Sequence, residues 1–223
     1  MTALFVTGTG TDVGKTFVAA SIVRQLRTRG LAARAFKPVI SGYDPAVADQ
    51  SDSAVLLDAA GELATPEMIA AISPWRFAAP LAPNMAARRE GKHVDFAAVV
   101  AFCRDAIATA QGPVLIEGVG GVMSPISDEE TVLDWIAVLG IPAVLVCGSY
   151  LGAISHALTA LLALERRAIK VPAIFVSESP KGIDLDETCA SLRRITVVPV
   201  IGVRRSTEQI GLDQVPDLDA LLR

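Results

Sequence analysis

Three glycines and a Gly-Lys-Thr triplet lie close together near the start of the chain, within residues 4–16 (LFVTGTGTDVGKT). Gly8, Gly10 and Gly14 permit backbone angles at which successive N–H groups can converge on an anion. The apolar residues before the loop predict a buried strand. The residues after Gly14 predict the start of a helix, whose N-terminal N–H groups and dipole attract phosphate. This order of strand, loop and helix is typical of a phosphate-binding loop.

Two side chains at the end of this loop could act on a nucleoside triphosphate. Lys15 is positioned to contact the β- and γ-phosphates, and the Thr16 hydroxyl is positioned to bind Mg²⁺. The strict pattern has glycine five residues before Gly14, where this chain has Thr9, and Gly8 comes one residue earlier. The loop is therefore either one residue longer than the pattern or tolerant of threonine.

Further polar side chains follow predicted strands. Lys37 falls at the carboxyl end of a predicted strand at 32–36, with Ser41 four residues later, and Glu117 ends a predicted strand at 114–116. Ligands of open α/β sheets bind beside the carboxyl ends of strands, so Lys37 and Ser41 are a candidate catalytic pair. Glu117, with the glycines after it, is a candidate Mg²⁺ ligand. Asp52 either caps a helix or binds Mg²⁺ opposite Thr16.

The predicted elements that position these residues alternate between strand and helix. Helices are expected after the phosphate loop, after Asp52, and after the strand ending at Glu117. Later strands are predicted at 143–147, 171–176 and 196–201, and a short helix is expected near Leu218. Residues 66–94 are expected to be less regular, with 73–77 and 80–84 forming a packed loop over the edge of the sheet. This pattern predicts one α/β domain over residues 1–223, with a mostly parallel sheet and helices on both faces.

Composition excludes several classes of protein. The chain has 223 residues, 52% of them apolar, and a net charge of −4, which argues against an extended basic surface for nucleic acid. No apolar run approaches the length of a membrane span, and no basic leader segment precedes the first strand. Three widely separated cysteines predict buried reduced thiols, which fits a cytoplasmic protein.

The combination of motifs resembles the dethiobiotin synthetase family of P-loop NTPases. The specific part is the extended phosphate loop together with Lys37-Pro38-Val39-Ile40-Ser41-Gly42. Ser51-Asp52, Glu117-Gly118-Val119-Gly120-Gly121, Phe77-Ala78-Ala79-Pro80 with Pro83, and Leu151-Gly152-Ala153-Ile154-Ser155-His156 add support, so the resemblance covers about residues 3–176. The family's loop contains the same extra residue at the position of Thr9.

The resemblance implies an ATP-dependent ligase acting on a 7,8-diaminononanoate-type diamine and CO₂. One amine forms a carbamate, the carbamate attacks the γ-phosphate, and the second amine closes a cyclic urea. The family is homodimeric. The resemblance assigns Lys37, Lys15 and Thr11 to catalysis, Ser41, Leu151, Gly152 and Ser155 to the diamine, Thr16, Asp52 and Glu117 to Mg²⁺, and Asp12, Val13, Gly14, Lys15, Thr16, Phe17, Asp52, Glu117, Gly118, Val119, Gly120, Ser177 and Glu178 to the nucleotide.

The chain departs from the family pattern at several positions away from the phosphate chemistry. Ser177 stands where the family usually has an asparagine that reads the purine, so we expect weaker or altered selection of the base. Ser155 replaces an asparagine that contacts the substrate tail, and Asn84 replaces a common histidine. Residues 203–206 lack a proline that is often present.

Two other classes of protein remain open. Nucleotide-switch ATPases that position plasmids or division sites share the expected fold and a related loop, but usually carry an additional lysine early in the loop, where this chain has Thr9 and Gly10. They also lack the Lys-Pro-x-x-Ser-Gly segment. Another ligase of the same superfamily, such as a cobyrinate amidotransferase, would carry a glutaminase domain for which 223 residues leave little room.

Overall fold

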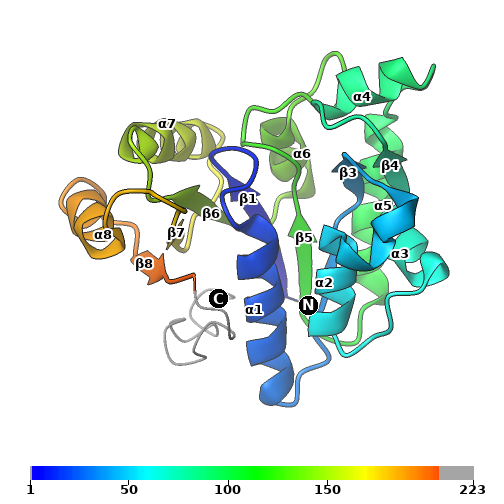
Figure 1. The fold of residues 1–223 in the computed structure, drawn as a ribbon, viewed down its shortest axis with the longest axis horizontal. Coiled ribbons are helices and arrows are strands. Elements are labelled where there is room, and N and C mark those ends of the chain that lie inside the picture. Colours follow the sequence, from blue (N-terminus) through cyan, green and yellow to red (C-terminus); the bar gives the residue numbers. More distant parts are fainter. Residues whose placement is uncertain (1, 206–223) are drawn as a thin grey trace.

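A six-stranded sheet forms the centre of the molecule in this computed structural model, which describes residues 2–205 (Figure 1). All neighbouring strands pair in parallel, in the spatial order β2-β5-β1-β6-β7-β8. The strands are β1 (Ala3–Gly8), β2 (Arg34–Phe36), β5 (Val114–Glu117), β6 (Ala143–Gly148), β7 (Ile174–Ser177) and β8 (Val200–Val203). This architecture confirms the predicted α/β fold with a mostly parallel sheet.

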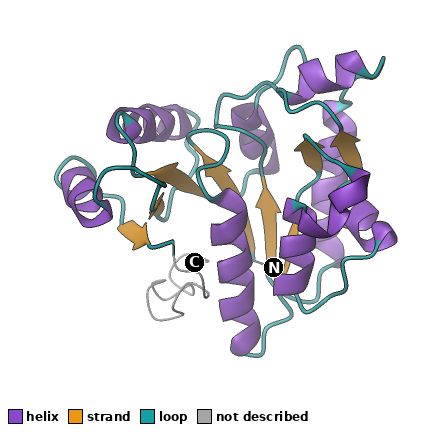
Figure 2. Cartoon of the chain, in the orientation of Figure 1, coloured by secondary structure: helices purple, strands orange, loops and turns teal. Residues whose placement is uncertain are grey.

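Helices cover both faces of this sheet, as the cartoon in Figure 2 shows. In that view α1 and α2 lie in front of the sheet and α5 and α6 behind it. The helices are α1 (Lys15–Thr28), α2 (Asp52–Ala59), α3 (Pro66–Ile72), α4 (Pro83–Arg89), α5 (Phe96–Thr109), α6 (Val132–Leu139), α7 (Ala153–Arg166) and α8 (Leu185–Arg193), with a 3₁₀ helix η1 (Pro45–Gln50). Because both faces are covered, the strands carry almost unbroken apolar runs.

The core between these layers is made mainly of aliphatic side chains with a few aromatic contacts. Trp135 of α6 and Phe5 of β1 are fully buried, and their ring centroids lie 5.0 Å apart in an edge-to-face arrangement. All three cysteines are free and buried, as predicted. Within residues 2–205, no helix is both long enough and apolar enough to cross a membrane.

The sheet register brings the chemically interesting strand ends to one edge. Val6 of β1 lies opposite Glu117, and Gly8 at the end of β1 lies opposite Val146 of β6. Further along the sheet, Gly148 lies opposite Ser177. Since parallel strands end at the same edge, the phosphate loop after β1 lies beside the segments that follow β5, β6 and β7.

The prediction that residues 66–94 are irregular, with a packed loop at 73–77 and 80–84, was wrong. This segment contains α3, α4 and a short strand β4 (Trp75–Phe77), which pairs in parallel with β3 (Val39–Ser41) to form a second, two-stranded sheet. Pro66 and Pro83 lie in the first turn of their helices, where proline is well tolerated, so they mark helix starts. Thr65 caps α3 through its side chain.

Several predicted element boundaries also differ. The strand predicted at 171–176 forms over Ile174–Ser177, and the one predicted at 196–201 forms over Val200–Val203. Pro38 ends the strand before it, as predicted, but a new strand begins directly afterwards at Val39. The helix expected near Leu218 lies outside the described residues.

Candidate active site

A cavity of about 610 Å³ opens at the carboxyl edge of the sheet, between the phosphate loop and the segments after β2 and β5. It brings together residues from six separate stretches of the chain. Twelve of the site residues predicted from the sequence line it: Thr11, Asp12, Gly14, Lys15, Thr16, Phe17, Lys37, Ser41, Asp52, Glu117, Val119 and Gly120.

The phosphate loop has the backbone geometry that an anion-binding loop requires. Gly14 is the residue before α1 and adopts φ +94°, a left-handed conformation that an L side chain rarely adopts. Asp12 also has positive φ, at 56°. Inside the loop, the Lys15 ammonium donates a hydrogen bond to the carbonyl oxygen of Gly10 at 2.6 Å. Burial, together with repulsion from Lys37, lowers the pKa of Lys15 to about 8.

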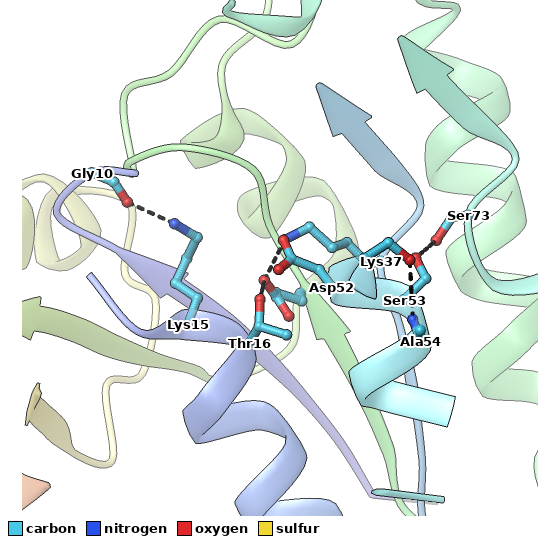
Figure 3. A network of polar contacts seen from close by, with 10 residues as sticks. Gly10, Lys15, Thr16, Lys37, Asp52, Ser53, Ala54 and Ser73 are labelled. Atoms are coloured by element: carbon cyan, nitrogen blue, oxygen red, sulfur yellow. Dashed lines mark hydrogen bonds and ion pairs between the residues drawn. The ribbon is translucent and has the colours of Figure 1, made fainter. Parts of the chain in front are cut away.

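A second polar cluster surrounds the end of β5 (Figure 3). The Lys37 ammonium donates to Oε1 of Glu117 at 2.6 Å and also to the Asp52 carboxylate. The Thr16 hydroxyl donates to the same Glu117 oxygen at 2.7 Å. One carboxylate oxygen therefore joins the start of α1 to the segment after β2, and Asp52, at the start of α2, closes the cluster.

Charge balance explains why this cluster is stable although it is buried. The side chain of Glu117 is fully buried and that of Lys37 is 6% exposed, whereas that of Asp52 is 48% exposed. Burial alone would lower the pKa of Lys37, but the two carboxylates outweigh it and raise this pKa above its usual value. Burial would likewise raise the pKa of Asp52, but Lys37 holds it below its usual value. Lys37 and Asp52 therefore both stay ionised at neutral pH.

The same cluster has donors that suit a magnesium ion. Oε2 of Glu117 is buried and has no hydrogen-bond partner among the residues that the structure describes. Hydroxyl and carboxylate oxygens are the ligands that Mg²⁺ prefers, and Thr16, Asp52 and Glu117 offer them at one corner of the cavity. Mg²⁺ usually retains several water and phosphate ligands, so a small protein donor set is sufficient.

Ser41, at the end of β3, also lines the cavity. Its hydroxyl oxygen is buried and, within the described part of the chain, makes no hydrogen bond. Gly42 follows with φ +77° and lies against Pro80, so the small second sheet positions this wall. Residues 80–83, which also line the cavity, belong to the stretch that we expected to be a loop.

Two of the predicted nucleotide residues have a packing role. Val13 is buried against Gly8, where an added Cβ would lie 3.0 Å from Val13 Cγ2. A Cβ at Gly118 would lie 2.8 Å from the Phe5 ring, so glycine is needed there for close packing on β1. Val13 and Gly118 therefore contribute to the packing of their loops and do not line the cavity.

The remaining predicted residues lie outside this cavity, on the segments after β6 and β7. An added Cβ at Gly14 would lie 2.6 Å from the Ser177 hydroxyl, so Ser177 lies directly against the phosphate loop. Glu178 accepts a hydrogen bond from the main-chain N–H of Arg205. Gly152 precedes α7 with φ +95°, and Leu151 is 89% exposed. Ser155 lies on the exposed first turn of α7.

The sequence reasoning missed other residues at the site. Ser124 and Arg205 line the main cavity, and the Ser124 hydroxyl accepts a hydrogen bond from the N–H of Gly121. A second cavity of about 550 Å³ lies on the α7 side of the phosphate loop and includes His156 and Met123. No local pattern in the sequence marks Ser124 or Arg205, since tertiary contacts alone bring them to the cavity.

Comparisons with known proteins place the chain in a family. A family model described as an AAA domain matches residues 2–210. The chain is 50% identical to the ATP-dependent dethiobiotin synthetase BioD of Methylobacterium nodulans, covering 97% of this chain and 100% of the relative. It is 47% identical to the ATP-dependent dethiobiotin synthetase BioD of Acidiphilium cryptum, and the alignment covers 87% of this chain and 88% of the relative.

Solved structures show the same fold at low sequence identity. The signal recognition particle receptor FtsY from Elizabethkingia anophelis matches with a TM-score of 0.56 and 15% identity, over 100% of this chain and 65% of that chain. The MinC:MinD cell division protein complex of Aquifex aeolicus matches with a TM-score of 0.56 and 11% identity, over 93% of this chain and 83% of that chain. These two likenesses concern the fold alone, whereas the sequence similarity to the two BioD proteins covers 97% and 87% of the chain. The chain belongs to the family of ATP-dependent dethiobiotin synthetases.

Proposed function

We propose that this protein uses ATP to join CO₂ to 7,8-diaminononanoate and to close the product into the cyclic urea dethiobiotin, releasing ADP and phosphate. The observation that carries the proposal is the convergence of two buried ammonium groups, Lys15 and Lys37, on one cavity beside Thr16 and Glu117. A reaction between a carbamate and a triphosphate must bring two anions together, and this cavity contains the charges that such an encounter requires.

In the first stage, one amine of the diamine attacks CO₂ and loses a proton, which gives a carbamate. A carbamate oxygen then attacks the γ-phosphorus of ATP, the bond to the bridging oxygen breaks, and ADP leaves. Lys15 would stabilise the β- and γ-phosphate oxygens, and Lys37 would neutralise the carbamate as it approaches. Ser41, whose buried hydroxyl has no partner among the described residues and which lines the same cavity, would donate a hydrogen bond to the carbamate. The Thr11 side chain and the loop N–H groups would donate hydrogen bonds to the phosphoryl oxygens while the phosphoryl group is transferred.

In the second stage, the other amine attacks the carbamate carbon of the carbamic–phosphoric anhydride. A carbon–nitrogen bond forms, the carbon–oxygen bond to phosphate breaks, and the amine loses its proton as the five-membered ring closes. The protein's contribution is positioning, since holding the reacting groups in line gives effective molarities on the order of 10⁵–10⁸ M in favourable cases. Thr16, Asp52 and Glu117 would hold Mg²⁺, which when bound offsets the negative charge of the phosphates.

We further propose that the nucleotide base lies near Ser177 and Glu178, beyond the phosphate loop. The contact between Ser177 and Gly14 supports this position, because it puts the end of β7 next to the loop that binds phosphate. The short serine side chain offers fewer hydrogen-bonding groups to a purine than an asparagine. We therefore expect the protein to discriminate weakly among nucleoside triphosphates.

We also propose that two copies of the chain form a dimer that completes the site for the substrate tail. Leu151, Met123 and Leu162 are exposed apolar side chains, and Met123 lines the second cavity. A partner seated here would cover them, and would place Leu151, Gly152 and Ser155 where they could meet the carboxylate end of the diamine. We expect the enzyme to work in the cytoplasm, where its three buried thiols stay reduced.

One experiment tests the reaction. Purified protein is incubated with the diamine, bicarbonate, Mg²⁺ and each nucleoside triphosphate in turn, and the cyclic urea and the released phosphate are measured together. The proposal expects one phosphate per cyclic urea and none without diamine. Phosphate release that is independent of the diamine would overturn the proposal in favour of a nucleotide-switch ATPase. Separately, light scattering of the same sample tests whether the protein is a dimer.

A further inference from the structure

The segments that follow β6 and β7 are held together by a reciprocal pair of serines, Ser149 and Ser179. The N–H of Ser149 donates a hydrogen bond to Oγ of Ser179 at 3.0 Å, and the N–H of Ser179 donates one to Oγ of Ser149, also at 3.0 Å. The Ser149 carbonyl oxygen accepts a third bond, from the N–H of Ile183 at 2.6 Å. Ser149 is fully buried, and its N–H, hydroxyl and carbonyl groups all bond the segment after β7.

Two glycines let these segments approach each other closely. An added Cβ at Gly148 would lie 2.5 Å from Oγ of Ser179, and one at Gly182 would lie 2.3 Å from the carbonyl oxygen of Ser149. Side chains at these two positions would push the segments apart, whereas glycine allows direct contact. The serine pair is therefore closely packed as well as hydrogen-bonded, and the place of Ser179 depends on Ser149.

The pair lies just beyond the point where the main-chain pairing of β6 with β7 ends, at Ser177 of β7. On its other side the segment after β7 is attached to β8, because the N–H of Glu178 donates to the Val203 carbonyl at 2.8 Å. Ser149 provides the attachment on the β6 side. The two attachments together hold the end of β7, where Ser177 lies against Gly14 of the phosphate loop.

We propose that Ser149 and Ser179 are positioning residues for the base of the nucleotide. They act through Ser177 and Glu178, which they hold at the distance from the phosphate loop at which one nucleotide binds by its phosphates and its base together. The inference rests on the proposed position of the base beside Ser177 and Glu178, and it goes further by assigning the placement of that segment to its contact with the end of β6. When the pair is broken, the segment occupies the binding arrangement for a smaller fraction of the time, and the apparent affinity for a nucleotide falls with that fraction.

The test compares a nucleotide with the phosphates that it carries. ADP and inorganic pyrophosphate, each with Mg²⁺, are titrated by calorimetry into the full-length protein and into its Ser149→Ala and Ser179→Ala variants. Each substitution removes the acceptor of one main-chain N–H of the pair, so we expect about tenfold weaker binding of ADP. Pyrophosphate has no base, so its affinity for both variants should stay within about twofold of that for the unmodified protein.

Ser73→Ala is the matched control. It breaks the hydrogen bond of 2.6 Å between Ser53 and Ser73, a second pair of fully buried serines, which belongs to α2 and the end of α3. This variant should melt at a lower temperature, as the two test variants should, because all three lose a buried hydrogen bond. It should bind ADP and pyrophosphate as the unmodified protein does.

Three results would overturn the inference: unchanged ADP affinity in both test variants, an equal loss of affinity for pyrophosphate, or an equal loss of ADP affinity in Ser73→Ala. The second would show general damage to the phosphate loop, and the third a general effect of lost stability. Thermal unfolding verifies that each variant is folded during the titration, and Ser179, which is only partly buried, offers the milder substitution. A selective loss of ADP affinity in a protein that forms no cyclic urea would support this inference and refute the proposed reaction, so the two failures are distinguishable.

Discussion

Replacing Lys37 with methionine removes a buried positive charge while keeping most of the volume of the side chain. The effect on stability depends on the two carboxylates that Lys37 leaves behind, those of Glu117 and Asp52. Glu117 is fully buried and loses its ion-pair partner, while the Thr16 hydroxyl still donates to it. Asp52 also loses its partner, but its side chain is 48% exposed, so water solvates it. The cost therefore comes mainly from Glu117.

Breaking a buried ion pair by removing one partner typically costs about 3–5 kcal/mol. For a chain of this size each kcal/mol lowers the melting temperature by about 2–4 °C, so we expect Lys37→Met to melt roughly 6–20 °C below the unmodified protein. Two controls isolate the cause. Lys92→Met removes an exposed lysine that pairs with Glu90 at the surface and should barely change the melting temperature. The double variant Lys37→Met with Glu117→Gln should recover much of the loss, because no buried carboxylate then lacks a partner.

The same variant also tests the proposed chemistry. Without Lys37 the cluster carries two uncompensated carboxylates, so added Mg²⁺ should stabilise Lys37→Met more than the unmodified protein. Formation of the cyclic urea should fall by at least about 100-fold, since the approaching carbamate loses its counter-charge, while ADP binding remains measurable. Differential scanning calorimetry with and without Mg²⁺ and a product assay provide the measurements. A melting temperature within a degree of the unmodified protein, or normal turnover, would refute the reasoning.

Three further predictions concern other parts of the molecule. Gly14→Ala should abolish nucleotide binding in a titration with ADP, because its φ of +94° disfavours a side chain and the new Cβ would lie 2.6 Å from the Ser177 hydroxyl; ordinary affinity would contradict this. Asp52→Asn should raise the Mg²⁺ concentration needed for half-maximal product formation by about tenfold, the effect of losing roughly 1.4 kcal/mol of ion binding, and an unchanged Mg²⁺ titration would remove Asp52 from the metal site. Burial raises the pKa values of Cys103 and Cys147 to about 12, so a thiol reagent at pH 8 should label neither of them until the protein unfolds, as peptide mapping of the labelled sites would show.

The local patterns of the sequence predicted most strands and helices of the main sheet, including the strand and the helix on either side of the phosphate loop. A buried strand, a glycine loop and Gly14-Lys15-Thr16 lie together in the chain, and their geometry depends on neighbours along the backbone. Prediction failed at residues 66–94, where each element is only three to seven residues long. The hydrophobic period of such short segments is weak, and we took their prolines for loop residues although two of them begin helices.

The order of the strands could not be derived from those patterns. β5 lies between β2 and β1, which puts Glu117 between Lys37 and Thr16, although Glu117 is 80 residues from Lys37 and 101 from Thr16 in the chain. A predicted strand end places a residue at one edge of the sheet. It does not show which other strand ends lie beside that residue. Only this order lets one carboxylate oxygen accept hydrogen bonds from both side chains.

By itself, then, the sequence determined the phosphate loop, the alternation of strands and helices, and the residue types available for binding anions and magnesium. These features depend on backbone freedom and periodicity, which are local properties of a chain. The tertiary structure decided which side chains share the cavity: it turned Glu117 into the link between Lys37 and Thr16, put Ser177 against Gly14, and brought Arg205 to the wall. Those contacts depend on the packing of strands from distant parts of the chain, and no neighbouring residues specify them.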